Sequence, residues 1–208
     1  IIALQDRLFW TESVQKGIVS ADAFDYGDRG MALWEGDITR LDADAIVNAA
    51  NRGLLGCFLP NHNCIDNAIH SAAGMQLRDD CAKIIAAQGH EENVGDCKLT
   101  RAYNLPCRYV LHTVGPMIRR EVSDDERSML RSCYISCLDA AAAAGLGTVA
   151  FCCISTGVFN FPRAEAAEIA VGAVVRWKLR HPQSNVRVVF NTFLKEDTEI
   201  YRNILSMV

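Results

Sequence analysis

Short apolar runs that end in polar residues alternate with amphipathic helical stretches along most of this chain, and this alternation restricts its fold more than any other feature. The expected strands cover residues 31–35, 43–48, 97–103, 109–114, 148–154 and 186–191. One expected helix begins near residue 65, and three more cover residues 126–144, 163–179 and 196–205. Strands that alternate with helices pack as layers around a largely parallel sheet. We therefore predict a three-layer α/β fold, with a mixed, mostly parallel central sheet and helices on both faces.

A chain of 208 residues is long enough for one domain with a full hydrophobic core. Because no linker or internal repeat interrupts the alternation, we predict a single domain over residues 31–208. In residues 1–30, Ile1, Leu4 and Leu8 recur at helical spacing. We expect this segment to be a helical extension packed on the domain.

The composition excludes several classes of protein. A net charge of −4 argues against extended nucleic-acid binding, so an anionic ligand would be held by backbone amides and helix dipoles. No apolar stretch has the roughly 18 residues of a membrane span. Nine cysteines are an odd number, and several lie in apolar runs, which favours reduced thiols in a cytoplasmic protein. We expect a monomer. Whether a targeting segment precedes Ile1 is left open.

In sheets of this type, ligands bind beyond the carboxyl ends of the strands. The loop 36–39, Gly-Asp-Ile-Thr, directly follows an expected strand. The carboxylate of Asp37 can accept a hydrogen bond from an exocyclic amine such as that of adenine. The alternative is that Asp37 caps the next turn.

A second loop, residues 155–162, joins a buried strand to a helix that opens at Pro162. Small residues let backbone N–H groups approach a phosphate, and the helix N-terminus adds its positive dipole end. With a single glycine, position alone favours an ordinary strand-to-helix turn equally.

The third loop carries two thiols and an imidazole in the pattern C-x4-H-x-C, formed by Cys57, His62 and Cys64. Zinc prefers nitrogen and sulfur ligands in a tetrahedron. Only three ligands lie close together, and this is the arrangement of a zinc ion with an open fourth position. The alternative places both cysteines in the core and His62 on the surface, but Pro60 and the neighbouring asparagines argue against a packed apolar core.

Asp66 falls in the first turn of the helix that follows, where its charge complements the helix dipole. It also follows Cys64 by two residues, so it can orient a water or a ribose hydroxyl near the metal. We interpret His70, one turn further on, as a satisfied helix histidine, and His112 as a structural residue near the active edge of the sheet.

Five segments together resemble the macrodomain family, the ADP-ribose-binding fold. They are residues 36–39, 45–51, 68–74, 109–116 and 155–159. The resemblance spans about residues 31–205 in the right order. Where ordinary hydrolytic macrodomains have a glycine run, residues 56–66 of this chain look instead like the zinc-containing macrodomain class of microbes.

The resemblance implies a zinc-dependent hydrolase that removes mono-ADP-ribose from modified protein side chains. Asp37 would hold the adenine amine, the 155–159 loop would wrap the diphosphate, and Asn48 would contact the distal ribose. The implied ADP-ribose site comprises Asp37, Ile38, Asn48, Asn51, Cys64, Ile65, Asp66, Ser155, Thr156, Gly157, Val158 and Phe159. Asn51 and Asp66 would be catalytic. Cys57, His62 and Cys64 would hold one Zn²⁺.

Three alternatives stay open at this point. The chain is a binding module that recognises ADP-ribose without chemistry, or it hydrolyses O-acetyl-ADP-ribose, which has an ester as the scissile bond. In the third, the zinc loop is purely structural. The residues alone do not choose between ester and glycosidic cleavage.

Overall fold

The computed structural model describes residues 1–59 and 62–208. Its central sheet has six strands in the order β2-β8-β7-β4-β6-β5. They are β2 (Met31–Glu35), β4 (Ala45–Ala49), β5 (Cys97–Arg101), β6 (Tyr109–Thr113), β7 (Thr148–Phe151) and β8 (Arg187–Thr192). Neighbouring strands run parallel except at one edge, where β5 pairs antiparallel with β6. The predicted mixed, mostly parallel sheet is confirmed.

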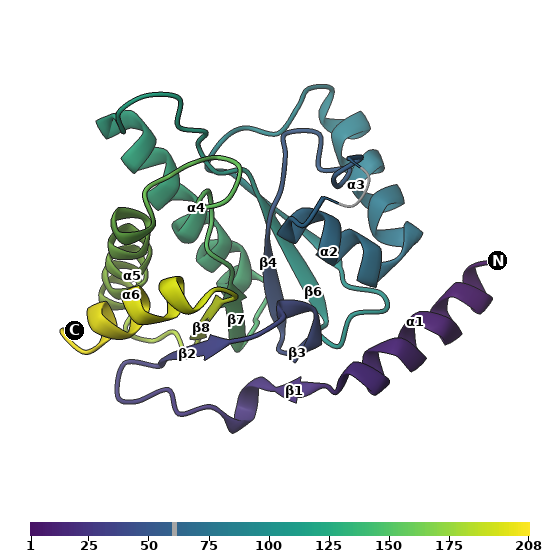
Figure 1. Cartoon of the computed structure of the whole chain (residues 1–208), viewed down its shortest axis with the longest axis horizontal. Coiled ribbons are helices and arrows are strands. Elements are labelled where there is room, and N and C mark those ends of the chain that lie inside the picture. Colours follow the sequence, from purple (N-terminus) through teal and green to yellow (C-terminus); the bar gives the residue numbers. More distant parts are fainter. Residues whose placement is uncertain (60–61) are drawn as a thin grey trace.

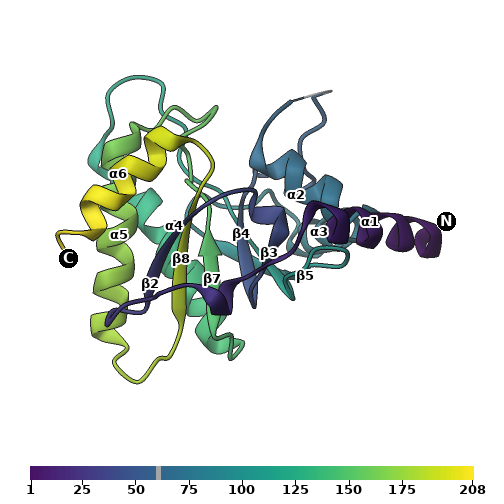
Figure 2. The same cartoon turned by 60° about the horizontal axis from the view of Figure 1, so that its bottom comes forward.

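Helices flank this sheet (Figures 1 and 2). They are α2 (Ile65–Ala73), α3 (Met75–Gln88), α4 (Asp124–Ala143), α5 (Arg163–Arg180) and α6 (Lys195–Leu205), whereas α1 (Ile2–Lys16) lies outside these layers beside α2. Helix α4 packs on α5 and α5 on α6, while α2 and α3 lie beside β4 and β5. This confirms the predicted three-layer α/β fold.

The central strands are buried along almost their whole length, which explains why they appear in the sequence as continuous apolar runs. All four residues of β7 are buried, as are residues 45–48 of β4. On the helix side, Cys133 and Cys137 are fully buried in α4, as expected of core residues. The apolar stripe of α4 therefore packs into the same core as these strands.

Helix α3 and the end of β7 differ from the predictions. The helix that begins at Ile65 ends at Ala73, because Gly74 has a φ of +96° that breaks the helix before α3 begins. Helix α3 was not predicted, since it buries only Leu77 and Cys81 and so has a narrow apolar stripe. The strand expected over 148–154 ends at Phe151, so Cys152 and Cys153 lie beyond its carboxyl end.

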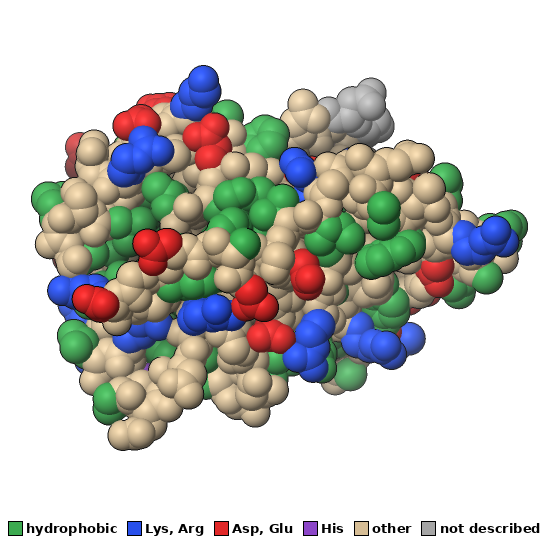
Figure 3. Space-filling view, turned by 90° about the horizontal axis from the view of Figure 1, so that it is seen from below, with side chains coloured by type: hydrophobic (Ala, Val, Ile, Leu, Met, Phe, Trp, Pro, Cys, Tyr) green, Lys and Arg blue, Asp and Glu red, His purple; other side chains and the backbone are tan. Residues whose placement is uncertain are grey.

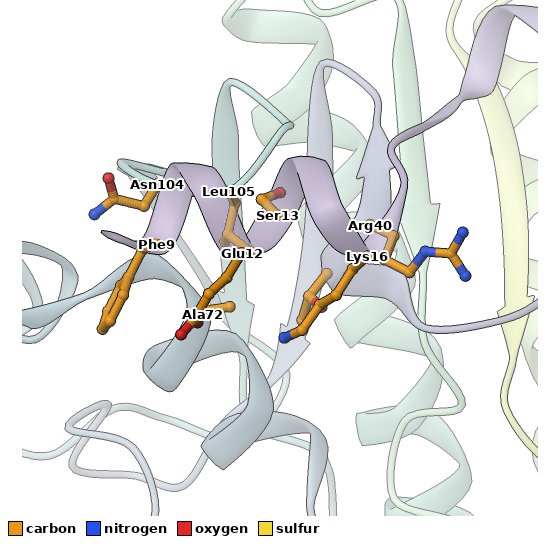
Figure 4. Close-up of a pocket in the computed structure, with 9 residues that line it drawn as sticks. Phe9, Glu12, Ser13, Lys16, Arg40, Ala72, Asn104 and Leu105 are labelled. Carbon is orange, nitrogen blue, oxygen red and sulfur yellow. The ribbon is translucent and has the colours of Figure 1, made fainter. Parts of the chain in front are cut away.

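The N-terminal segment has two parts. No residue of α1 is buried, and the helix is attached through hydrogen bonds such as that from the Met75 amide to Gln5 Oε1 (3.0 Å). The space between α1 and the domain is about 20 Å³, enough for about one water molecule (Figure 4). After α1, β1 (Val19–Ser20) pairs with β3 (Leu41–Asp42), and Ala21 and Tyr26 enter the core.

The surface carries charges of both signs. On the face in Figure 3, Lys and Arg side chains are interspersed with Asp and Glu side chains and with apolar residues. Among the described helices, none is both long and apolar enough to cross a bilayer.

Candidate active site

A cleft of about 580 Å³ lies at the carboxyl ends of the parallel strands. Its walls include residues that follow β4, β6, β7 and β8, the four strands at the middle of the sheet. These residues are Ala50, Asn51, Gly115, Cys152, Cys153, Phe193 and Leu194. The cleft therefore lies where ligands bind in sheets of this type.

Asp66 is 5% exposed and lines this cleft. Asn48 Nδ2 donates to Oδ1 at 2.8 Å, and Asn51 Nδ2 donates to Oδ2 at 3.0 Å. Burial raises the pKa of Asp66, and the two amide hydrogen bonds oppose that shift. The predicted trio of Asn48, Asn51 and Asp66 is thus brought together as one hydrogen-bonded group.

Asn51 is held in place by the backbone of its own loop. Its Nδ2 also donates to the Gly56 carbonyl at 2.9 Å, and its Oδ1 accepts from the Gly53 amide at 3.0 Å. Because a donor and an acceptor of the main chain fix the two ends of the side-chain amide, its orientation is determined without reference to Asp66.

Cys57, His62 and Cys64 converge at the cleft wall. Their ligand atoms all lie within 4.8 Å of one another, and Cys57 Sγ is 3.2 Å from His62 Nδ1. Tetrahedral zinc bond lengths of about 2.3 Å to sulfur and 2.0–2.1 Å to nitrogen place ligand atoms roughly 3.5–3.8 Å apart. These three residues fit such an ion. Pro60, used above as an argument for an open loop, lies outside the described residues.

The first turn of α2 organises this cluster. The Asn67 amide donates to Cys64 Sγ at 3.4 Å, and Asn67 Nδ2 donates to the His62 carbonyl at 3.0 Å. Burial raises the pKa of the Cys64 thiol, and the Asn67 amide opposes that shift. Hydrogen bonds of this kind orient ligand residues around a metal.

The 155–159 loop forms another wall of the cleft. The amides of Thr156, Gly157, Val158 and Phe159 donate to no acceptor within the described part of the chain. Ser155 has a φ of +65°, which is uncommon for a residue with a side chain, and the Phe161 amide holds it by donating to its carbonyl at 2.9 Å. Free amides in the loop that leads to α5 can cradle a phosphate group.

The loop 36–39, which contains Asp37, contributes none of the described residues that line the cleft. The side chain of Asp37 accepts from the Thr39 amide at 3.0 Å and from Thr39 Oγ1 at 2.7 Å. It therefore caps the short helix η2 (Ile38–Arg40), as the alternative interpretation proposed. Ile38 is buried, and the roles of both residues toward adenine stay predictions.

The interpretation of His70 as a satisfied helix histidine is wrong. His70 is buried, and neither ring nitrogen has a hydrogen-bond partner among the described residues. The nearest carboxylate oxygen, Asp66 Oδ1, is 3.6 Å from Nε2, beyond hydrogen-bond distance. Burial lowers the pKa of His70 to about 4, which keeps the ring neutral.

A model of the Macro domain family matches residues 47–170, which is more than half of the chain. The chain belongs to the Macro domain family. The matched region contains the Asp66 network, the cysteine–histidine cluster and the 155–159 loop. The resemblance inferred from the sequence is confirmed at the level of the family.

Relatives of this macrodomain include hydrolases. It is 49% identical over 209 residues to the Protein-ADP-ribose hydrolase of Treponema medium, a match that covers 99% of this chain and 80% of that protein. It is 55% identical over 175 residues to the Protein-ADP-ribose hydrolase of Staphylococcus aureus, covering 84% of this chain but only 65% of that protein's length. The Trypanosoma brucei macrodomain in complex with ADP-ribose has a TM-score of 0.78 and 36% identity, covering 90% of this chain and 77% of that one.

Several residues that line the cleft of the macrodomain were missed by the sequence analysis. Phe193 and Leu194 follow β8, and their position directly after a strand was the available signal. Arg163 and Asp197 form a two-fold contact, with Arg163 Nη1 at 2.7 Å from each carboxylate oxygen. They are 34 residues apart in the sequence, and no local pattern joins them.

Gly115 sets the packing of the 155–159 loop, which gives a test. A Cβ at this position would lie 2.0 Å from Ser155 Oγ and 2.8 Å from Ile154 Cγ2. We expect Gly115→Ala to lower the free energy of unfolding by about 1–3 kcal/mol, because the loop and the end of β7 must move. Urea denaturation measures this change.

Gly157 provides the matched control within the same loop. A Cβ there would meet no atom within 4 Å, so Gly157→Ala should change the free energy of unfolding by less than about 0.5 kcal/mol. Equal midpoints for both variants would contradict the packing described here.

Proposed function

We propose that this macrodomain is a zinc-dependent hydrolase that removes mono-ADP-ribose from modified protein side chains. The observation that carries the proposal is the convergence of three groups on one cleft: the free amides of residues 156–159, the buried carboxylate of Asp66, and the cluster of Cys57, His62 and Cys64. Relatives that are 49% and 55% identical are Protein-ADP-ribose hydrolases, which supports hydrolysis as the reaction class.

The cleft suits ADP-ribose in size and in the kind of groups it offers. A volume of about 580 Å³ lies within the range of small-molecule and cofactor sites. The amides of residues 156–159 would take the diphosphate, and the exposed ring of Phe193 offers an apolar surface for a base. A macrodomain of the same fold binds ADP-ribose in its solved complex, which supports this assignment.

Cys57, His62 and Cys64 would hold the zinc ion at the wall of the cleft. When bound at three protein ligands, zinc supplies a Lewis acid beside the reacting sugar. Ligand thiols bind as thiolates, so metal binding releases protons and depends on pH.

Asp66 and Asn51 would position the attacking water at the anomeric carbon of the distal ribose. Hydrolysis joins the water oxygen to that carbon and breaks the carbon's bond to the side-chain oxygen of the protein. One proton of the water stays on the new hydroxyl, and the other passes to the released carboxylate group. Because Asn48 and Asn51 hold both oxygens of Asp66, the carboxylate is oriented before substrate arrives.

Asp66→Asn tests the catalytic role. The amide keeps the size of the side chain and removes the charge, so kcat for release of ADP-ribose should fall by about 100-fold or more. The assay follows release of labelled ADP-ribose from a protein mono-ADP-ribosylated on acidic residues. Asp44→Asn is the control. Asp44 lies just before the amino end of β4, where its side chain accepts from the Gly147 and Thr148 amides, so this variant should leave turnover unchanged.

The same assay separates the other functions. Tight binding of ADP-ribose by the wild type without release of the label would identify a binding module and end the hydrolase proposal. Release of acetate from O-acetyl-ADP-ribose, with no action on the modified protein, would assign the ester substrate instead.

Metal binding is tested by titrating chelator-treated protein with Co²⁺, which gives a thiolate-to-metal absorption band. We expect one equivalent to bind to the wild type and the band to be lost in Cys57→Ser. Cys97 is a half-buried cysteine in β5, and Cys97→Ser should bind metal as the wild type does. An unchanged band in Cys57→Ser, or full hydrolase activity in metal-free protein, would rule out the zinc assignment.

A further inference from the structure

The side-chain amides of Asn48 and Asn51 both donate to Asp66, but different groups fix their orientations. Asn51 is fixed by the backbone of its own loop, through the Gly53 amide and the Gly56 carbonyl. Asn48 is fully buried, and its Oδ1 has no partner among the described residues. Apart from Asp66, the described side chain that meets the Asn48 amide is His112, with Nδ1 at 3.2 Å from Asn48 Nδ2.

The hydrogens of Asn48 Nδ2 determine which nitrogen of His112 carries its proton. A primary amide has two N–H groups, and one of them donates to Asp66 Oδ1 at 2.8 Å. The other points to His112 Nδ1, which must then accept. His112 Nε2 therefore carries the proton and donates it to Thr100 Oγ1 at 2.9 Å. Burial lowers the pKa of His112 to about 3, in agreement with a neutral ring.

We propose that His112 is a positioning residue for the hydrolase: it accepts from Asn48 and thereby holds the Asn48 amide with Nδ2 toward Asp66. If His112 carried its proton on Nδ1, that N–H would face the Asn48 NH₂ group. Relief of this contact by rotation of the amide would turn Oδ1 toward the Asp66 carboxylate and remove one of its two donors. The chain of contacts runs from Thr100 in β5, through His112 in β6 and Asn48 in β4, to Asp66 in α2.

The same protonation state argues against metal binding at a second cluster. His70, Cys81 and His112 also place ligand atoms within 4.8 Å of one another, all three buried. Cys81 Sγ lies 3.7 Å from His112 Nε2, on the side where the ring carries its proton. A metal ion could bind Nε2 only by displacing the proton that His112 donates to Thr100, so this nitrogen serves the hydrogen-bond network.

The first test measures the protonation of His112 in the wild type and requires no activity assay. Long-range ¹H–¹⁵N spectra of the ring nitrogens report the tautomer of each histidine, and the signals of His112 are assigned by their loss in His112→Asn. In the wild type we expect His112 to be neutral with its proton on Nε2 between pH 5 and pH 8. A proton on Nδ1, or a charged ring at pH 6, would overturn the proposal.

The second test compares two variants, and it rests on the proposed hydrolase function. His112→Asn places an amide oxygen near the position of Nδ1, where it can still accept from Asn48. His112→Gln places its amide near Nε2, where it reaches Thr100 and leaves Asn48 without an acceptor. We expect kcat to be lower in His112→Gln than in His112→Asn by about 10-fold to 100-fold, because a displaced catalytic group costs this much.

The affinity for ADP-ribose separates a positioning role from a general loss of structure. The dissociation constant of ADP-ribose should change by less than about threefold in both variants, since the lost interaction acts in turnover. Equal kcat values for the two variants, or a better His112→Gln, would refute the positioning role. If neither variant folds, the tautomer in the wild type decides. A wild type that releases no ADP-ribose refutes the hydrolase function, whereas a wrong tautomer refutes only the role of His112.

Discussion

A carboxylate buried at the end of a sheet needs hydrogen-bond donors within reach, and Asp66 obtains its two donors from β4 and from the loop that follows. This requirement ties three parts of the chain together. Asn48 belongs to the strand, Asp66 to the first turn of α2, and Asn51 to the loop that leads to Cys57. Because Asn51 also bonds to the main chain at Gly53 and Gly56, its side chain links the carboxylate to the loop that leads to the cysteine–histidine cluster.

Two clusters of cysteine and histidine lie in this region, one with two cysteines and the other with two histidines, and their surroundings differ. Cys57, His62 and Cys64 are half-buried at the wall of the cleft, and the amide of Asn67 supports the sulfur of Cys64. His70, Cys81 and His112 are fully buried, and the proton on His112 is fixed by Asn48. The ligand atoms are equally close in both clusters, so the clusters are distinguished by their access to the cleft and by the tautomer that a neighbouring amide imposes.

Much of the arrangement was predictable because it depends on local patterns. Strands of a parallel sheet are apolar along their length, and the polar residues that follow them meet at one edge, which placed Asn51 and the 155–159 loop correctly. Other features depend on contacts between distant segments. Arg163 meets Asp197 across two helices, and His112 meets Thr100 and Asn48 across three strands. Helix α3 escaped prediction for a third reason: its burial is confined to two side chains.

The cleft has little free positive charge for an anionic ligand, in keeping with a chain whose net charge is −4. Arg163 lines it, but both oxygens of Asp197 contact that guanidinium and offset its charge. A diphosphate would therefore depend on the main chain, and the conformation of Ser155 shows how the main chain is arranged for it. A positive φ at a serine costs about 1–3 kcal/mol and persists only where the surroundings enforce it. Here the Phe161 amide fixes the serine carbonyl, and the side chain packs against Gly115, so the four amides that follow stay free of internal acceptors. The proposed diphosphate site would thus depend on strained backbone at Ser155 instead of on a lysine or arginine.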